Sequence, residues 1–209
     1  MNNETVWESF QKVHSLTDIQ LGQFKRYAQL LIDWNSRMNL TAITELNAII
    51  NDHFADSLAG GLLIEEYNRL HMADVGAGAG FPGVPLLIKY DQASCIFIEI
   101  NGKKREFLTA TSTELGLAER ATVCDLDWRT FLRATTYEID CFVARASLRP
   151  DELVRALTSK NNYSQALIAY WASQQWQPGA KESPYLQRDI AYQCGGKQRR
   201  ILIFAQQKL

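Results

Sequence analysis

The sequence lacks the features of several large classes of protein. Its 209 residues contain no apolar run of about 18 residues, the length at which a helix can cross a membrane. The first residues show no basic segment followed by an apolar stretch, so we expect no secretory signal. Hydrophobic residues make up 46% and charged residues 22%, which excludes collagen, coiled coil and wholesale disorder. The length predicts one domain, or one domain with an appendage.

Metal-binding patterns are also missing. The four cysteines, at Cys95, Cys124, Cys141 and Cys194, lie far apart and form no C-x-x-C pair. The three histidines form no H-E-x-x-H motif or other cluster of ligands. We therefore predict no metal, and we expect the cysteines to be buried thiols in a reducing cytoplasm.

A strong excess of one charge is absent as well. The net charge is −1, which argues against a uniformly cationic nucleic-acid binder. Residues 1–70 carry 5 basic and 9 acidic side chains, whereas residues 71–209 carry 17 basic and 14 acidic ones. The balance leaves room for an RNA-binding surface on the C-terminal part of the chain.

Helical patterns fill residues 1–70, which we expect to form a small helical cap. Thr17 and Gln20 form a capping box, and apolar residues then recur at helical spacing through Met38. A second helix is predicted over residues 44–63. His53 and Asp56 lie close to its apolar face, so we expect them to make a hydrogen-bonded contact between the cap and a sheet.

Short apolar runs alternate with helical segments after residue 70. The predicted strands are His71–Val75, Cys95–Ile100, Ala121–Cys124, Asp140–Ala144, Ala166–Tyr170, Ala191–Cys194 and Ile201–Ala205. The predicted helices between the first five are Pro82–Tyr90, Gly102–Leu115, Trp128–Arg133 and Pro150–Leu157. This alternation predicts an α/β domain over residues 71–209, with a mainly parallel sheet covered on both faces. No helix separates the last two strands, which predicts an antiparallel hairpin.

The segment Asp74–Gly83 is a glycine-rich loop between a predicted strand and a predicted helix. Gly76, Gly78 and Gly80 allow the backbone to turn tightly and to approach a ligand closely. The strand ends at the carboxyl edge of the sheet, where ligands of open α/β folds bind. Glu99 ends the next strand, where its carboxylate can accept both ribose hydroxyls of an adenosine.

Two cofactors fit this loop. A G-x-G-x-x-G match that ends at Gly83 corresponds to the dinucleotide fingerprint and would indicate NAD, but Pro82 lies in that turn and supplies no N–H to a phosphate. The overlapping pattern D-x-G-x-G-x-G begins at Asp74, whose carboxylate would repel a pyrophosphate and suits the ammonium of a methionine moiety. The loop therefore favours S-adenosylmethionine.

Five segments of the chain resemble one known family, the bacterial 16S ribosomal RNA guanine-N7 methyltransferase G family, also called glucose-inhibited division protein B. The resembling segments are Trp34–Thr41, His53–Leu58, Asp74–Gly83, Asn101–Leu108 and Ala144–Ala146. The chain departs from the family pattern at Glu99, where the family usually has Asp, and at residues 160–163 and 169–171.

The resemblance implies a class I S-adenosylmethionine-dependent methyltransferase fold, with seven strands, the last antiparallel, behind the helical cap. It implies methyl transfer to N7 of one guanosine in 16S ribosomal RNA of the small subunit. It places further cofactor positions, beyond Asp74, Gly78, Gly80 and Glu99, at Gly76, Phe81, Asp127, Trp128 and Arg145. Within the loop 125–128, an alignment to the family that is shifted by one residue is an open alternative to Asp127 and Trp128.

Direct attack by guanine N7 needs no general base, because N7 has an in-plane lone pair and carries no proton. We therefore predict no acid–base residue, and the sequence contains neither an N-P-P-Y element nor a Pro-Cys pair. Substrate contacts are predicted at Arg145 and at Lys103, Lys104 and Arg105, where a solvated face is the alternative. Other open functions are methylation of a small molecule or protein, an NAD-dependent oxidoreductase, and a binding module without catalysis.

Overall fold

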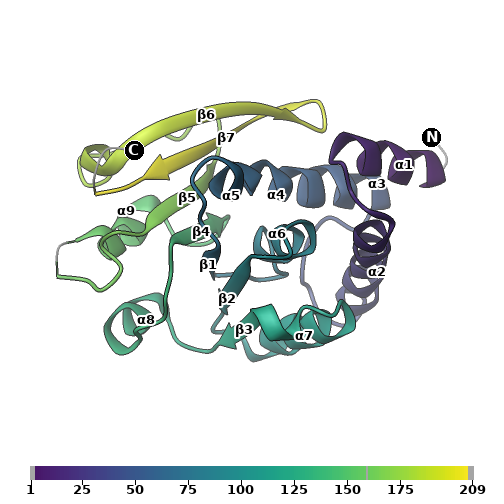
Figure 1. Ribbon diagram of the computed structural model, residues 1–209, viewed down its shortest axis with the longest axis horizontal. Coiled ribbons are helices and arrows are strands. Elements are labelled where there is room, and N and C mark those ends of the chain that lie inside the picture. The colour runs from purple at the N-terminus through teal and green to yellow at the C-terminus, as the bar shows by residue number, and fades with distance from the viewer. Residues whose placement is uncertain (1–2, 159, 207–209) are drawn as a thin grey trace.

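A computed structural model describes residues 3–158 and 160–206. Within them, seven strands form one sheet in the order β3-β2-β1-β4-β5-β7-β6 (Figure 1). The strands are β1 (His71–Val75), β2 (Ser94–Ile98), β3 (Ala121–Cys124), β4 (Cys141–Arg145), β5 (Leu167–Ala172), β6 (Leu186–Cys194) and β7 (Lys197–Phe204). The pairs among β1 to β5 are parallel, and β7 is antiparallel to both β5 and β6. The predicted α/β fold with a terminal hairpin is confirmed.

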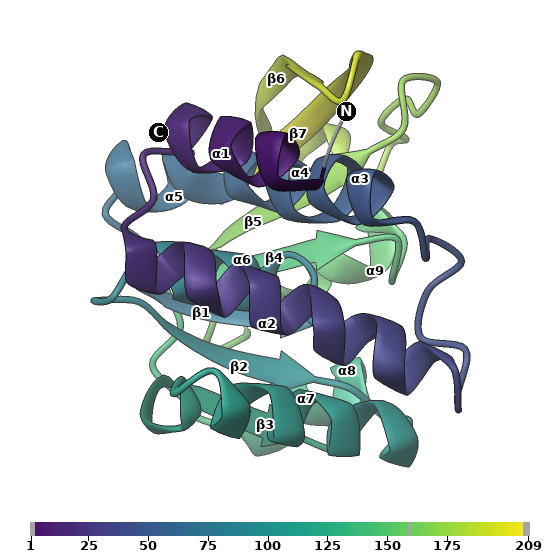
Figure 2. The same cartoon turned by 90° about the vertical axis from the view of Figure 1, so that its right-hand side faces the viewer.

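The helices lie on both faces of the sheet. One face is covered by α1 (Asn3–Val13), α2 (Asp18–Asn35), α6 (Gly83–Lys89), α7 (Gly102–Glu114) and a continuous helical run over residues 46–65 (Figures 1 and 2). The run consists of α3 (Leu46–Ala48), the π-helical segment η1 (Ile49–Ala55), α4 (Asp56–Leu58), the 3₁₀ turn η2 (Ala59–Gly61) and α5 (Leu62–Glu65). The other face carries α8 (Trp128–Ala134), α9 (Pro150–Leu153) and η4 (Val154–Leu157). Two further 3₁₀ turns are η3 (Ala118–Arg120) and η5 (Ser183–Tyr185).

Alternation along the strands divides the buried residues into two cores. On β4, Val143 faces the first core, whereas Phe142 and Ala144 face the second. The first core also contains Phe24 of α2 and Phe54 of η1, both fully buried. The N-terminal helices and the sheet therefore share one hydrophobic core.

Several elements differ from the sequence prediction, among them strand β7, which begins at Lys197 rather than at Ile201. The predicted helix over residues 44–63 is present as the run over residues 46–65, but η1 within it is π-helical rather than α-helical. Strand β6 begins at Leu186 rather than at Ala191. Because β6 is the edge strand, polar residues such as Arg188 and Asp189 lie exposed along it and interrupt the apolar pattern.

The structure confirms two predictions made from short stretches of sequence, the capping box and the buried cysteines. The Thr17 hydroxyl accepts from the Gln20 N–H at 3.2 Å, and the Gln20 side chain accepts from the Thr17 N–H at 3.0 Å, which confirms the capping box. All four cysteines are buried and free. Across residues 3–158 and 160–206, no helix is long and apolar enough to cross a membrane.

Candidate functional site

The strand order reverses between β1 and β4, and the carboxyl ends of these two strands carry the glycine loop and Arg145. Open α/β sheets bind ligands at such a switch point. The glycine loop follows β1 with positive φ at Gly76, Gly78 and Gly80 (68°, 58° and 90°). A Cβ at Gly76 would lie 2.6 Å from Ser147 Cβ, and one at Gly80 would lie 2.6 Å from Val84 Cγ2.

Gly78 differs from the two glycines that flank it. A Cβ at Gly78 would meet only the Gly76 carbonyl oxygen, at 3.8 Å, so open space lies beside this residue. The Gly78 N–H donates to Glu99 Oε2 at 2.9 Å, and the Asn101 N–H donates to Glu99 Oε1 at 2.8 Å. The structure thus brings together the glycine loop and the carboxylate at the end of β2, as the sequence predicted.

Asp74 lies beneath the loop rather than in the cavity. Its side chain is fully buried, and Oδ2 accepts from the Gly83 N–H at 2.9 Å. Oδ1 has no hydrogen-bond partner among the described residues. Burial raises the pKa of this carboxyl to about 7. A contact between Asp74 and the ammonium of a methionine moiety stays a prediction.

The side chains of Asp127 and Trp128 are engaged elsewhere. Asp127 caps α8 by accepting from the N–H groups of Arg129 and Thr130, and the hydrogen bonds from Thr130 hold its pKa below the usual range. The Trp128 ring belongs to the second core, and its Nε1 donates to the Glu152 carbonyl at 2.8 Å. Neither residue lines the cavity described below, so their assignment to the cofactor also stays a prediction.

Asp125 was not singled out from the sequence. It follows β3 directly, is exposed, and borders a shallow hollow together with Gly102 and Arg105. This position at the carboxyl end of β3 is adjacent to Glu99 at the end of β2, because β2 and β3 are paired in parallel up to Cys124.

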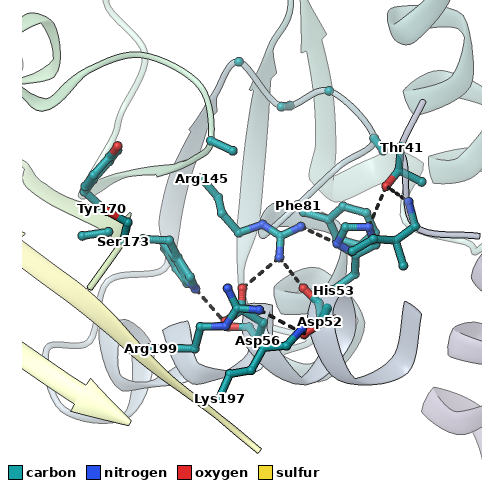
Figure 3. A pocket seen from close by; sticks show the side chains of 18 of the residues that line it. Thr41, Asp52, His53, Asp56, Phe81, Arg145, Tyr170, Ser173, Lys197 and Arg199 are labelled. Carbon is teal, nitrogen blue, oxygen red and sulfur yellow. Dashed lines mark hydrogen bonds and ion pairs between the residues drawn. The ribbon is translucent and has the colours of Figure 1, made fainter. Parts of the chain in front are cut away.

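A cavity of about 600 Å³ lies between the glycine loop, the ends of β4 and β5, η1 and the β6–β7 hairpin (Figure 3). Five cations line it: Lys104, Arg145, Lys197, Arg199 and Arg200. The carboxylates that line it are those of Asp52 and Asp56. The cavity is therefore rich in positive charge.

The hairpin cations are partly neutralised by η1. Lys197 Nζ lies 2.8 Å from Asp52 Oδ2, and Arg199 Nη2 lies 3.0 Å from Asp52 Oδ1. The two cations hold the pKa of the Asp52 carboxyl below its usual range. These ion pairs could not be predicted from the sequence, because nothing in it showed that η1 lies beside the hairpin.

Arg145 is held by the N-terminal helices. Its Nη1 lies 2.9 Å from Asp56 Oδ2 and donates to the Asp52 carbonyl at 2.9 Å, while Nη2 lies 2.7 Å from His53 Nδ1. The guanidinium also lies over the Phe81 ring, 4.9 Å from its centre. The predicted hydrogen-bonded contact of His53 and Asp56 with the sheet is confirmed. Contacts of Arg145 and Phe81 with cofactor or substrate stay predictions.

The three basic residues at the start of α7 have separate environments. Lys104 lines the cavity, whereas Lys103 is exposed outside it. Arg105 folds back and donates through Nη1 to the carbonyl oxygens of Glu99 and Ile100. The structure therefore places only Lys104 of the three beside the cavity.

The model of the family described as GidB, rRNA small subunit methyltransferase G, matches residues 20–200. The chain belongs to this family. The ribosomal RNA small subunit methyltransferase G of Lactococcus lactis subsp. cremoris (strain SK11) is 32% identical over 206 residues, covering 92% of this chain and 85% of that protein. The protein of the same name from Geobacillus sp. (strain WCH70) is 36% identical over 182 residues, covering 85% and 76%.

Other methyltransferase G relatives match over a shorter part. The alignment to the Staphylococcus epidermidis (strain ATCC 12228 / FDA PCI 1200) protein is 38% identical over 122 residues and spans about half of its length, 48%. Among solved structures, a precorrin-6y C5,15-methyltransferase from Geobacter metallireducens GS-15 has a TM-score of 0.52 at 13% identity, covering 80% of this chain and 91% of that one. TrmN from Thermus thermophilus has a TM-score of 0.52 at 14% identity, covering 77% and 53%. These structures confirm the class I methyltransferase fold.

Proposed function

We propose that this protein transfers the methyl group of S-adenosylmethionine to N7 of a guanosine in 16S ribosomal RNA of the small subunit. The observation that carries the proposal is the adjoining pair of sites at the switch point. One is the glycine loop with Glu99, and the other is the cation-rich cavity that contains Arg145. Membership of the methyltransferase G family supports both the reaction and the substrate.

The residues around Gly78 fit S-adenosylmethionine. The open space beside Gly78 gives room for the methionine moiety, since no protein atom beyond the Gly76 carbonyl oxygen would contact a Cβ there. Each Glu99 oxygen accepts one backbone N–H, from Gly78 or Asn101, so a lone pair on each would remain for the ribose hydroxyls. The next residue, Ile100, is 68% exposed and would offer an apolar surface to an adenine. When bound, the cofactor supplies an electrophilic methyl group on a sulfonium.

The rest of the mechanism requires positioning rather than proton transfer. Guanine N7 attacks through its own lone pair, so the chain has to hold the base in line and exclude water, which contributes about 7–11 kcal/mol in well-oriented reactions. Arg145 is suited to this task because its guanidinium is fixed by three hydrogen bonds and one aromatic ring. We assign no general acid or base.

RNA binding is assigned to the cations around the cavity. Lys197 is 58% exposed despite its ion pair with Asp52, so it can exchange that partner for a phosphate. Lys104 of α7 also lines the cavity. A ribosomal RNA substrate implies that the protein acts in the cytoplasm.

Methylation of the small subunit tests the proposal directly. Purified protein would be incubated with labelled S-adenosylmethionine and either 16S RNA, small subunits or a metabolite extract, and the product nucleoside identified by mass spectrometry. We expect 7-methylguanosine in 16S RNA, and a much lower yield with Glu99→Gln, which removes one carboxylate acceptor. Label only in a small molecule or a protein would instead support the alternative methyltransferase. Thermal protection by NAD rather than by S-adenosylmethionine would overturn the cofactor assignment.

A further inference from the structure

Two segments of the N-terminal helices converge on Arg145 through a chain of hydrogen bonds. The Asn35 side-chain oxygen, at the end of α2, accepts from the N–H groups of Leu40 and Thr41 at 2.8 and 3.0 Å. Thr41 Oγ1 lies 2.9 Å from His53 Nε2, and His53 Nδ1 lies 2.7 Å from Arg145 Nη2 (Figure 3). The loop after α2 is thereby connected to the end of β4.

The partners of His53 determine which ring nitrogen carries the proton. A guanidinium can only donate, so His53 Nδ1 has to accept from Arg145 and carries no hydrogen. The hydrogen is then on Nε2, which donates to the Thr41 hydroxyl oxygen. Burial and the nearby Arg145 charge lower the pKa of His53 to about 3, so the imidazole is neutral at physiological pH.

Phe81 of the glycine loop supports both side chains. The His53 ring stacks on the Phe81 ring with centres 4.3 Å apart and planes inclined by 16°. The Arg145 guanidinium lies over the same ring. The stacking on Phe81 and the hydrogen bonds at both ring nitrogens therefore fix the plane of the imidazole. The imidazole in turn fixes one edge of the guanidinium.

Arg145 retains unused donors in this arrangement. Of its five N–H donors, three are taken by the Asp52 carbonyl, Asp56 Oδ2 and His53 Nδ1. The described residues offer no acceptor to Nε–H or to the second hydrogen of Nη2. Arg145 lines the cavity, so these two donors are available to a ligand there.

We propose that His53 is a positioning residue for methyl transfer. Through Nδ1 it orients the Arg145 guanidinium so that the two unused donors bind an acceptor oxygen of the target guanosine, and Thr41 accepts from the Nε2–H of the tautomer that Arg145 requires. This inference rests on the proposed function. A purely structural role, bridging η1 and β4, predicts changes in stability alone.

Two substitutions of His53 separate these roles. In His53→Asn the amide oxygen takes the place of Nδ1 and can still accept from Arg145, so we expect kcat within about threefold of wild type. In His53→Phe the ring still stacks on Phe81 but accepts nothing, and we expect kcat at least tenfold lower with an unchanged Kd for S-adenosylmethionine. His71→Phe is the matched control and should leave kcat unchanged, because His71 begins β1 at the end away from the glycine loop.

Thr41→Val tests the hydrogen bond that supports the imidazole. It removes the acceptor of Nε2–H, and also that of the Ile43 N–H, at nearly constant shape. We therefore expect kcat to fall three- to tenfold in the wild-type background and by less with His53→Asn, where only the Ile43 contact is lost. Nitrogen NMR of the imidazole provides a readout besides activity, because the shifts and couplings report which nitrogen is protonated. The expected result is an unprotonated Nδ1.

Several results would overturn the inference. These are a folded His53→Phe protein that turns over like wild type, a His53→Asn protein as slow as His53→Phe, and a proton on Nδ1. If wild-type protein binds S-adenosylmethionine but methylates no ribosomal RNA, the proposed function fails and the inference fails with it. Efficient methylation by wild type with a slow His53→Asn variant overturns the inference alone.

Discussion

Gly78 and Gly80 share a left-handed backbone but have different neighbours. The space beside Gly80 is filled by Val84, Tyr27 and Leu108, so this glycine serves the packing of the protein. The space beside Gly78 is open towards the proposed cofactor site. The motif in the sequence identified both as loop glycines, but only the packing around each shows which one a ligand would need.

Gly78→Ala should weaken cofactor binding while the protein stays folded. The new methyl group points into the proposed ligand space, and the positive φ costs about 1 kcal/mol of stability. Calorimetry should show S-adenosylmethionine affinity at least tenfold weaker. Gly116 has a similar φ, 69°, with nothing within 4 Å. Gly116→Ala should therefore show the same loss of stability with normal affinity, and normal affinity in Gly78→Ala would contradict the assignment.

Asp74 gives a prediction about pH. Its folded-state pKa, about 7, lies above the ordinary value because of burial. The stability contributed by the neutral carboxyl is fully present below about pH 4 and is lost as pH rises through 7. Asp74→Asn cannot ionise, and its amide oxygen can still accept from the Gly83 N–H.

Between pH 4 and pH 7, the unfolding free energy of wild type should therefore fall by about 2–4 kcal/mol relative to that of Asp74→Asn. Urea titrations at several pH values measure this difference. The low pKa values of His14 and His53 act in the opposite direction and cancel between the two proteins. A difference that does not change with pH would show that Asp74 is ionised throughout.

At the scale of elements, the helical run over residues 46–65 shows what the sequence could and could not predict. Its position and its contact with the sheet followed from the apolar spacing and from His53 and Asp56. The π-helical turn η1 did not, because residue spacing alone does not report an added residue per turn. The sequence also did not predict that Asp52 lies against Lys197, since these residues are 145 positions apart and meet only in the folded molecule.

Helix α2 is attached to the glycine loop by Tyr27, whose hydroxyl donates to the Ala79 carbonyl at 2.5 Å. Tyr27→Phe leaves that buried carbonyl without this donor, so we expect a loss of about 1–3 kcal/mol in stability. Because the loop is then less well held, the Kd for S-adenosylmethionine should rise severalfold.

Tyr163→Phe provides the comparison. Tyr163 is also buried and pairs its hydroxyl with Thr135 Oγ1 at 2.6 Å, but it belongs to the second core. Thermal unfolding should report a comparable loss for both variants, and calorimetry a weaker affinity only for Tyr27→Phe. Equal affinities would show that α2 does not influence the loop.

At the scale of the whole molecule, the N-terminal helices and the sheet share one hydrophobic core. The Phe54 ring is fully buried and lies within 6.4 Å of five other aromatic rings, those of Trp7, Phe10, Phe24, Tyr27 and Phe81. These rings come from α1, α2, η1 and the glycine loop, so the same cluster joins the N-terminal helices to the proposed site.

Phe54→Ala should therefore destabilise the whole chain, by about 3–5 kcal/mol. Tryptophan fluorescence reports on both cores, because Trp7 lies in the first and Trp128 in the second. In urea unfolding, the transition seen by fluorescence should coincide with the one seen by far-ultraviolet circular dichroism, as expected if both cores unfold together. Ile19→Ala, at a residue that is 77% exposed, should change stability by less than about 0.5 kcal/mol. Separate transitions would show that residues 1–70 unfold independently.

The position of β7 between β5 and β6 has a consequence for synthesis of the chain. During translation, β5 has no partner on its outer side until β7 emerges, about 30 residues later. The cavity wall formed by Lys197 and Arg199 is made by that same strand. A nascent chain that lacks β7 therefore cannot complete the cation-rich wall of the cavity. Under the proposed function, such a chain would hold the glycine loop and Glu99 in its sequence but would lack the cations needed to modify a ribosome.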